Sequence, residues 1–174
     1  MPDAERAAAA PGGAVATLVL GEFLPYRLSV VAEAVSLLFA TRYEARFGLS
    51  IPEWRVIAVL GEAAEPRSTQ EVIERTGMDR VRVSRAAIRL ADKGLIERRP
   101  QPNDQRAHLL RLTRSGCATY RQIVPLAHEL QAALAAALTP EERRQLDAIL
   151  AKLGARAAAL AERKGPATAG TDAA

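Results

Sequence analysis

The sequence predicts a mainly α fold that contains one short β-hairpin. Alanine, the strongest helix former, is the commonest residue of the 174, and only 4% of the chain is aromatic. Apolar residues recur at helical spacing through most of the chain, in segments that begin at helix-capping residues. Between residues 95 and 112 the spacing changes to alternation, which is typical of strands. These three observations indicate a helical protein with a hairpin near its middle.

The first two helices are expected at residues 23–47 and 50–61. Apolar residues in the first step by four and three, Pro25 fits its first turn, and Gly48 fits its C-terminal end. The second begins with the capping-box pattern Ser50-Ile-Pro-Glu53. Both helices are therefore predicted with defined ends.

Two shorter helices follow at residues 68–77 and 80–93. The first opens with a second capping-box pattern, Ser68-Thr-Gln-Glu71, and ends at Gly77. The other has Asp79 as its N-cap. Two short helices joined by a glycine-containing turn predict a helix-turn-helix.

The hairpin comes directly after this helix pair. Residues 95–99 and 107–112 are predicted as its strands, and the proline-marked segment 100–105 as its loop. A hairpin in this place is a wing, so the sequence predicts a winged helix-turn-helix.

The last two helices are predicted from Thr113 to about residue 138, bent at Pro125, and from Pro140 to about residue 163. A third capping-box pattern, Thr139-Pro-Glu-Glu142, opens the sixth helix. Its apolar residues step by four and three and form a seam that suits helix pairing: Leu146, Leu150, Leu153, Ala157 and Leu160.

Positive charge is concentrated in the middle of the chain. Residues 67–114 carry twelve basic and six acidic side chains, so this segment is +6 while the whole chain is +4. A basic segment in a chain whose remaining residues are acidic overall indicates a module that binds a polyanion. Chance clustering in an arginine-rich chain is the alternative.

The helix at 80–93 has the pattern of a helix that reads DNA. Val83, Ala87 and Leu90 form a narrow apolar stripe, which leaves the arginines beside it free to reach bases and phosphates. A solvated basic face is the alternative. In the wing, Arg106 would enter the minor groove, and Asp104 is close enough in sequence to hold its guanidinium in position. A local ion pair in the turn, with no contact to DNA, is the alternative. The candidate DNA-binding residues are Ser68, Arg80, Arg82, Ser84, Arg85, Arg89, Asp104 and Arg106.

Several function classes are excluded by what the sequence lacks. One cysteine and two histidines supply neither a disulfide framework, a metal site nor a nucleophile–base pair, so we expect no metal, no cofactor and no enzyme. No phosphate-binding or hydrolase motif occurs. No uninterrupted apolar run approaches the length of a membrane span, and no basic leader precedes the apolar residues 14–20. A cytoplasmic protein is expected.

The order of several short motifs resembles the MarR (multiple antibiotic resistance regulator) family. These are Gly94-Leu-Ile-Glu-Arg98, Asp104-Gln-Arg106 and Leu110-Arg-Leu-Thr-Arg-Ser-Gly116, preceded by Trp54-Arg-Val-Ile and Val83-Ser-Arg85. The resemblance covers about residues 20–163. Gln105 stands where the family often has a basic residue, which weakens a wing phosphate contact and leaves the Asp-x-Arg pair intact.

The resemblance implies a homodimer in which a small ligand binds between the helical dimerization region and the DNA-binding lobe. Residues 15–49 and 113–163 would form the helical dimerization region and 50–112 the DNA-binding lobe, with a disordered arm at 1–14 and a disordered tail at 164–174. The candidate ligand-binding residues are Tyr26, Arg27, Ser29, Trp54 and Tyr120. Arg27 is the most suggestive of these residues because it is a single basic residue in an otherwise apolar segment, where its guanidinium could bind an anionic ligand. An intramolecular ion pair with Glu22 or Glu33 is the alternative. Trp54 also fits a hydrophobic staple with Leu49.

Cys117 has two interpretations. Peroxide-sensing members of the family use a cysteine near the start of the first helix, and this chain has none there. A small packing residue is the favoured reading of Cys117, and a redox switch is the other.

Together these features predict a dimeric, ligand-responsive, sequence-specific DNA-binding transcription regulator. It would act as a repressor on a near-palindromic operator. The resemblance implies that a small organic effector, such as an aromatic carboxylate or its CoA thioester, releases it. The alternatives are a non-specific nucleoid protein with the same fold and a purely structural helical module. Comparing the affinity for a palindromic promoter site with that for random DNA at fixed salt separates the regulator from the nucleoid protein. A purely structural module would show no salt-dependent DNA binding at all.

Overall fold

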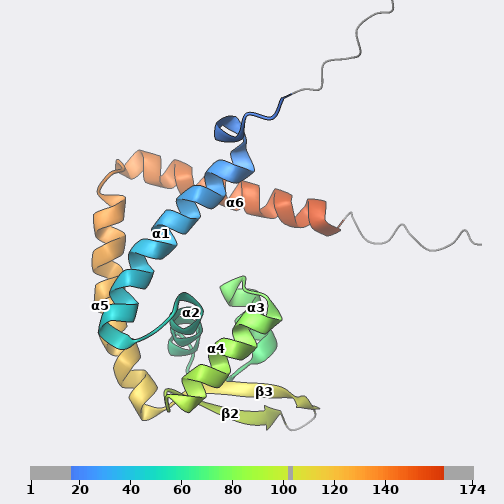
Figure 1. Cartoon of the computed structure of the whole chain (residues 1–174), viewed down its shortest axis with the longest axis vertical. Coiled ribbons are helices and arrows are strands. Elements are labelled where there is room, and N and C mark those ends of the chain that lie inside the picture. Colours follow the sequence, from blue (N-terminus) through green and yellow to red (C-terminus); the bar gives the residue numbers. More distant parts are fainter. Residues whose placement is uncertain (1–16, 102–103, 163–174) are drawn as a thin grey trace, which may run out of the picture. The chain divides into compact units, whose positions relative to one another are not determined.

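The computed structural model describes residues 17–101 and 104–162, with the backbone alone at 104–107. The predicted arm at 1–14 and the tail at 164–174 lie outside the described residues. The elements, in chain order, are η1 (Leu20–Glu22), α1 (Leu24–Phe47), α2 (Ile51–Gly61), β1 (Arg67–Ser68), α3 (Thr69–Thr76), α4 (Arg80–Asp92), β2 (Ile96–Gln101), β3 (Asp104–Leu112), α5 (Arg114–Ala135) and α6 (Pro140–Glu162). The prediction of a mainly α fold with a helix-turn-helix and a wing is confirmed (Figure 1).

The chain forms two compact units, which meet in sequence at residues 51 and 52. The first contains η1 and α1. Helix α1 begins after Phe23, carries proline in its first turn, and ends at Gly48, whose φ of 62° is the left-handed conformation that glycine adopts freely. Both predicted ends of this helix are confirmed.

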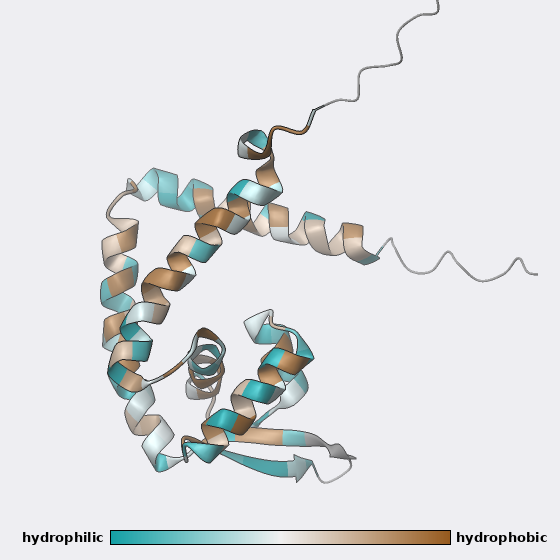
Figure 2. Ribbon diagram, viewed as in Figure 1, coloured by the Kyte–Doolittle hydropathy of each residue, from teal (hydrophilic) through white to brown (hydrophobic). Residues whose placement is uncertain are grey.

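Helix α1 displays many apolar side chains to solvent in the single chain, and Figure 2 shows their brown colour along it. Among the described helices it alone is long and apolar enough to cross a membrane, judged by length and composition only. The sequence reading found no uninterrupted apolar run of that length because Arg27 and Glu33 divide this one. So much exposed apolar surface indicates a helix that another surface covers.

The second unit contains the helix-turn-helix and the wing. Its α3 contacts α4 and both β1 and β3, while α4 contacts β2. The predicted stripe of α4 is confirmed: Val83, Ala87 and Leu90 are buried, together with Ala86. The core around it also includes Val56, Ile57, Leu60, Val72, Ile96 and Leu110.

Capping hydrogen bonds begin the helices of this unit where the sequence places them. Ser68 and Glu71 form both halves of the capping box of α3. The Asp79 side chain accepts from the Arg82 backbone N–H at 2.8 Å, and that of Thr113 accepts from Gly116 at 3.0 Å. These local bonds fix where each helix starts.

The wing is larger than the sequence predicts. It is a three-stranded antiparallel sheet of order β1-β3-β2, in which the two-residue strand β1 was not predicted. The hairpin strands also extend further, to Gln101 and from Asp104, so the prediction of a loop at 100–105 is wrong over most of its length. Pro100 is tolerated in β2 because this is an edge strand, where a missing N–H leaves the outer side unaffected.

Helices α5 and α6 complete the unit. Helix α5 contains Pro125, as predicted, and ends at Ala135, a few residues before the predicted end. Helix α6 has no buried residue, so its leucine seam, which includes Leu146, Leu150 and Leu160, is exposed in the single chain. Like α1, it presents apolar surface that the other described residues of one chain leave exposed.

Candidate DNA-binding surface

The outer face of α4 is strongly basic. Arg80, Arg82, Arg85 and Arg89 are all exposed, and Ser84 is half-buried at the edge of the same face. The opposite face is anchored in the core by the buried stripe. A helix fixed along one side, with long cationic side chains along the other, has the arrangement that reading a major groove requires.

The four arginines differ in how firmly they are held. Arg82 Nε lies 3.3 Å from Asp79 Oδ2, so the residue that caps the helix also orients this guanidinium. Arg89 Nε lies 3.8 Å from Glu53 Oε1. Within the described residues, Arg80 and Arg85 form no ion pair. These two are therefore the cations of α4 most available to a nucleic acid.

A buried carboxylate anchors the C-terminal end of α4. The side chain of Glu53, in the first turn of α2, is only 3% exposed and accepts a 2.9 Å hydrogen bond from Lys93 Nζ. The sequence assigned Glu53 only to a capping box. Its ion pair was missed because the partners lie 40 residues apart and no local pattern joins them. This contact links the C-terminal end of α4 to α2.

The outer face of the wing carries a shared ion pair. Arg99 and Arg111, on neighbouring strands, each donate to Oε2 of Glu97 at 3.0 Å. The hydrogen bond from Arg111, aided by the charges of Arg111 and Arg99, holds the pKa of Glu97 below its ordinary value. Two cations and one anion leave this face with a net positive charge at neutral pH.

The other basic residues of the wing are placed differently. Arg98 is half-buried and pairs in register with the buried Leu110, so it lies on the inner face of the sheet. Asp104 and Arg106 belong to β3 near the hairpin tip, but their side chains lie outside the described residues. A contact between them stays a prediction.

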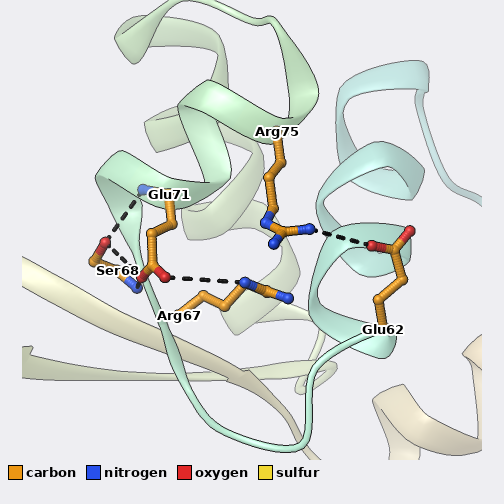
Figure 3. Close-up of polar contacts among 5 residues, drawn as sticks. All are labelled: Glu62, Arg67, Ser68, Glu71 and Arg75. Carbon is orange, nitrogen blue, oxygen red and sulfur yellow. Dashed lines mark hydrogen bonds and ion pairs between the residues drawn. The ribbon is translucent and has the colours of Figure 1, made fainter.

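A second polar cluster joins the start of α3 to the residues around it (Figure 3). The Ser68 hydroxyl donates to Glu71 Oε2 at 2.8 Å, and the backbone hydrogen bond from Ser68 is the main cause that lowers the pKa of Glu71. Arg67 NH1 lies 3.9 Å from Glu71, and Arg75 NH1 lies 3.7 Å from Glu62. Ser68 thus serves as the helix cap, and its contact with DNA stays a prediction.

Comparison with known proteins shows which family this sequence and fold resemble. A family model described as "MarR family" matches residues 47–107. The transcriptional repressor MprA of Escherichia coli is 38% identical over 80 residues, 46% of each chain, so the match spans about half of that relative. The crystal structure of a MarR/EmrR family transcriptional regulator from Acinetobacter sp. ADP1 is 28% identical, with a TM-score of 0.73, over 80% of this chain and 98% of that one.

Residues 47–107 of the chain match the MarR family, and the fold is that of a MarR/EmrR family transcriptional regulator. This is a family of transcription regulators and not of enzymes. The fold is shared beyond close relatives: a Bordetella bronchiseptica regulator, BpsR, superposes with a TM-score of 0.63 at 21% identity, over 74% of this chain and 98% of that one. Its structure is described in terms of regulation of DNA binding by 6-hydroxynicotinic acid.

The predicted effector residues fall in both units. Tyr26, Arg27 and Ser29 are exposed in the first turns of α1, where Ser29 Oγ donates to the Tyr26 carbonyl at 2.7 Å. Arg27 is therefore not a buried guanidinium in the single chain, and the cost of burying it gives no argument for a ligand there. Trp54 and Tyr120 are half-buried in the second unit.

A cavity of about 370 Å³ lies within the second unit, and Tyr120 is one of its walls. The cavity is bounded by the end of α2 and the loop after it, the end of β3 and the first turns of α5. Cys117 also lines it and is half-buried, which fits the packing role more closely than free exposure would. Trp54 is not part of this lining.

Proposed function

We propose that this MarR-family protein is a dimeric, sequence-specific DNA-binding regulator that represses transcription in the cytoplasm until a small effector releases it. The observation that carries the proposal is the two-sided construction of α4, with its apolar stripe in the core and four exposed arginines outside. The name of the relative MprA, a transcriptional repressor, supports the direction of regulation.

In this proposal α4 enters the major groove and the wing follows the adjacent minor groove. Arg80 and Arg85 contact base edges or phosphates, while Arg82 is presented by Asp79. Arg106 at the wing tip enters the minor groove, whose narrow parts attract guanidinium groups. Non-specific architectural binding is the competing function, because the same cations would bind any sequence.

The dimer in this proposal covers the apolar surface that one chain leaves in water. Exposed apolar residues on α1 and the exposed leucine seam of α6 supply that surface. A two-fold dimer would present two α4 helices about one turn of B-DNA apart, which matches a near-palindromic operator.

The effector we propose is an aromatic carboxylate or its CoA thioester. Tyr26, Arg27, Ser29, Trp54 and Tyr120 are the residues predicted to contact it, with Arg27 as the partner of the carboxylate. To release the protein, the effector must bind the DNA-free arrangement more tightly than the DNA-bound one. DNA binding by BpsR, a protein of the same fold, is regulated by 6-hydroxynicotinic acid, an aromatic acid, and this supports the proposed class of effector.

The test of DNA reading by α4 begins with genomic DNA fragments selected for binding to the wild-type dimer. Affinity for the tightest fragment is then measured for Arg85→Ala and Arg82→Ala, with Arg143→Ala, an exposed arginine of α6, as the matched control. Each α4 variant should lose about 1–3 kcal/mol of binding free energy, and the control should lose none. Unchanged affinity in both α4 variants, with intact folding, would rule out α4 as the reader.

Effector release is tested separately. A panel of aromatic acids and their CoA thioesters is titrated into the wild-type–DNA complex and into the Arg27→Ala complex. A ligand that acts through Arg27 should release the wild type at a lower concentration than the variant. Equal release of both proteins would remove Arg27 from the effector site.

A further inference from the structure

Two apolar side chains lie exposed among the arginines of α4. The Val81 side chain is 57% exposed and that of Ile88 is 43% exposed. The helix is already anchored in the core by its buried stripe, which contains neither residue. Single exposed apolar residues are common on protein surfaces, so the place of these two on the helix is what matters.

Val81 lies at the centre of the outward face of α4. With about 3.6 residues per turn, Val81, Arg85 and Ile88 fall on one line along the helix, opposite the buried stripe. Arg80 lies on one flank of this line and Arg82 on the other. When this face enters a major groove, the side chains on the central line point toward base edges, and the flanking guanidinium groups point toward the phosphates.

The N-terminal half of the line is the part that suits DNA. Val81 is in the first turn of α4, which begins at Arg80, and the helix-turn-helix proteins read base edges with the N-terminal residues of this helix. At the other end the line reaches the exposed Asp92, whose charge repels phosphates. Val81 is therefore placed for a base contact, whereas Ile88 lies about 10 Å further along the helix.

The side chain of Val81 offers only methyl groups to a base pair. In the major groove the C5-methyl group of thymine is the one apolar group on a base edge, because the other bases present hydrogen-bonding groups there. A valine placed against those polar groups would displace water without replacing its hydrogen bonds. Placed against a thymine, it buries apolar surface on both sides of the contact.

A second copy of the chain is the other surface that could cover Val81. A two-fold contact between α4 helices brings the same face of each copy together. The exposed arginines of that face would then meet arginines of the partner, which is unfavourable. DNA has the opposite charge, so the charge of this face favours DNA as its occupant.

We propose that Val81 is a specificity-determining residue of α4 and contacts the C5-methyl group of one thymine in each operator half-site. This inference rests on the proposed function, because it assigns a base to the helix that is proposed to read DNA.

The test removes a single methyl group from the DNA. The probe is the tightest genomic fragment selected with the wild-type dimer, in which each thymine of one half-site is replaced in turn by 2′-deoxyuridine, which lacks only the C5-methyl group. Affinity is measured with the full chain at one salt concentration. Replacement of the contacted thymine should weaken wild-type binding by about fourfold or more, the effect of no longer burying one methyl group.

Two variants assign this contact to a residue. Val81→Ala should lose most of the discrimination between thymine and deoxyuridine at that position. Ile88→Ala is the matched control, because it shortens an exposed apolar side chain on the same line of the helix, and it should keep the discrimination. Both changes are at exposed positions and introduce the strongest helix former, so α4 stays folded.

The possible failures are distinguishable. A selected fragment that is bound specifically, but with no sensitivity to the loss of any thymine methyl group, would overturn the role of Val81 and leave the proposed function intact. Equal discrimination by the wild type and Val81→Ala would assign the methyl contact to another residue. Failure to bind any fragment more tightly than a shuffled duplex would refute the proposed function, and this inference with it.

Discussion

The buried ion pair between Glu53 and Lys93 gives a prediction whose size follows from the structure. Lys93→Met keeps the apolar stem and removes the ammonium group, which breaks a 2.9 Å hydrogen bond to a carboxylate that is 3% exposed. Breaking a fully buried pair costs about 3–5 kcal/mol, and a hydrogen bond to a charged group contributes about 1.5–3 kcal/mol. Because the Lys93 side chain is itself 39% exposed, we expect the loss in the free energy of unfolding to be nearer the smaller of these two values.

We therefore expect Lys93→Met to lower the free energy of unfolding by about 1–3 kcal/mol. In a chain of this size that corresponds to a fall of about 2–12 °C in Tm. The charge of Arg89, 3.8 Å from the same Glu53 oxygen, limits the loss because it continues to compensate the carboxylate.

The assay is denaturant unfolding at one fixed protomer concentration, since a dimer's stability depends on concentration. Lys152→Met on α6 is the matched control because that lysine is exposed. A double-mutant cycle with Glu53→Gln should give a coupling energy of about 1 kcal/mol or more. If Lys93→Met is as stable as the Lys152→Met control, or if the two changes at Glu53 and Lys93 are additive, the pair does not anchor α4.

Three further predictions concern the wing, the dimer and pH. Arg106→Ala should lose operator affinity in a DNA-binding titration while its sedimentation and Tm stay unchanged; a loss of Tm with normal DNA binding would make the Asp104–Arg106 pair structural. Deleting residues 140–174 should give monomers or aggregates in analytical ultracentrifugation, because the leucine seam of α6 is removed; a well-folded dimer would refute the role of that seam. Because the pKa of Glu71 is below its ordinary value of 4.5 in the folded chain, its stabilising contribution is present above that value and is lost as pH falls through the lowered pKa. Acidification from pH 6 to pH 3 should therefore destabilise the wild type more than Glu71→Gln in thermal unfolding; equal pH profiles would contradict the role of the Ser68 capping box.

Local signals explain which parts of the fold were predictable. The caps at Ser68 and Asp79 act within three residues of themselves, so their patterns are visible in the sequence and their hydrogen bonds are found in the structure. The stripe Val83, Ala87 and Leu90 repeats with the helical period and is buried. Features that satisfy a local rule were therefore found at the correct residues.

Features that depend on distant residues were missed. Strand β1 has two residues, too few for any alternation, and exists because it pairs with β3 more than 40 positions later. The bond between Glu53 and Lys93 likewise joins two helices. In the wing, Pro100 was read as a loop residue because edge position, which makes it acceptable in a strand, is a property of the whole sheet.

The cavity residues show the same limit. Tyr120 was selected from the sequence as a ligand contact, whereas Arg111 and Arg121 were not, because nothing in their spacing places them on one cavity. Only the packing of the α2–β1 loop, the end of β3 and the start of α5 brings these side chains together.

The central claim is that α4 reads a specific sequence, and a specificity ratio tests it most directly. Affinity of the wild-type dimer is measured at one salt concentration for the tightest genomic fragment and for a shuffled duplex of equal length and composition. The account predicts binding to the selected fragment that is at least about 1,000-fold tighter, with most of that preference lost in Arg85→Ala. Equal affinity for the two duplexes would contradict it and identify a non-specific DNA-binding protein.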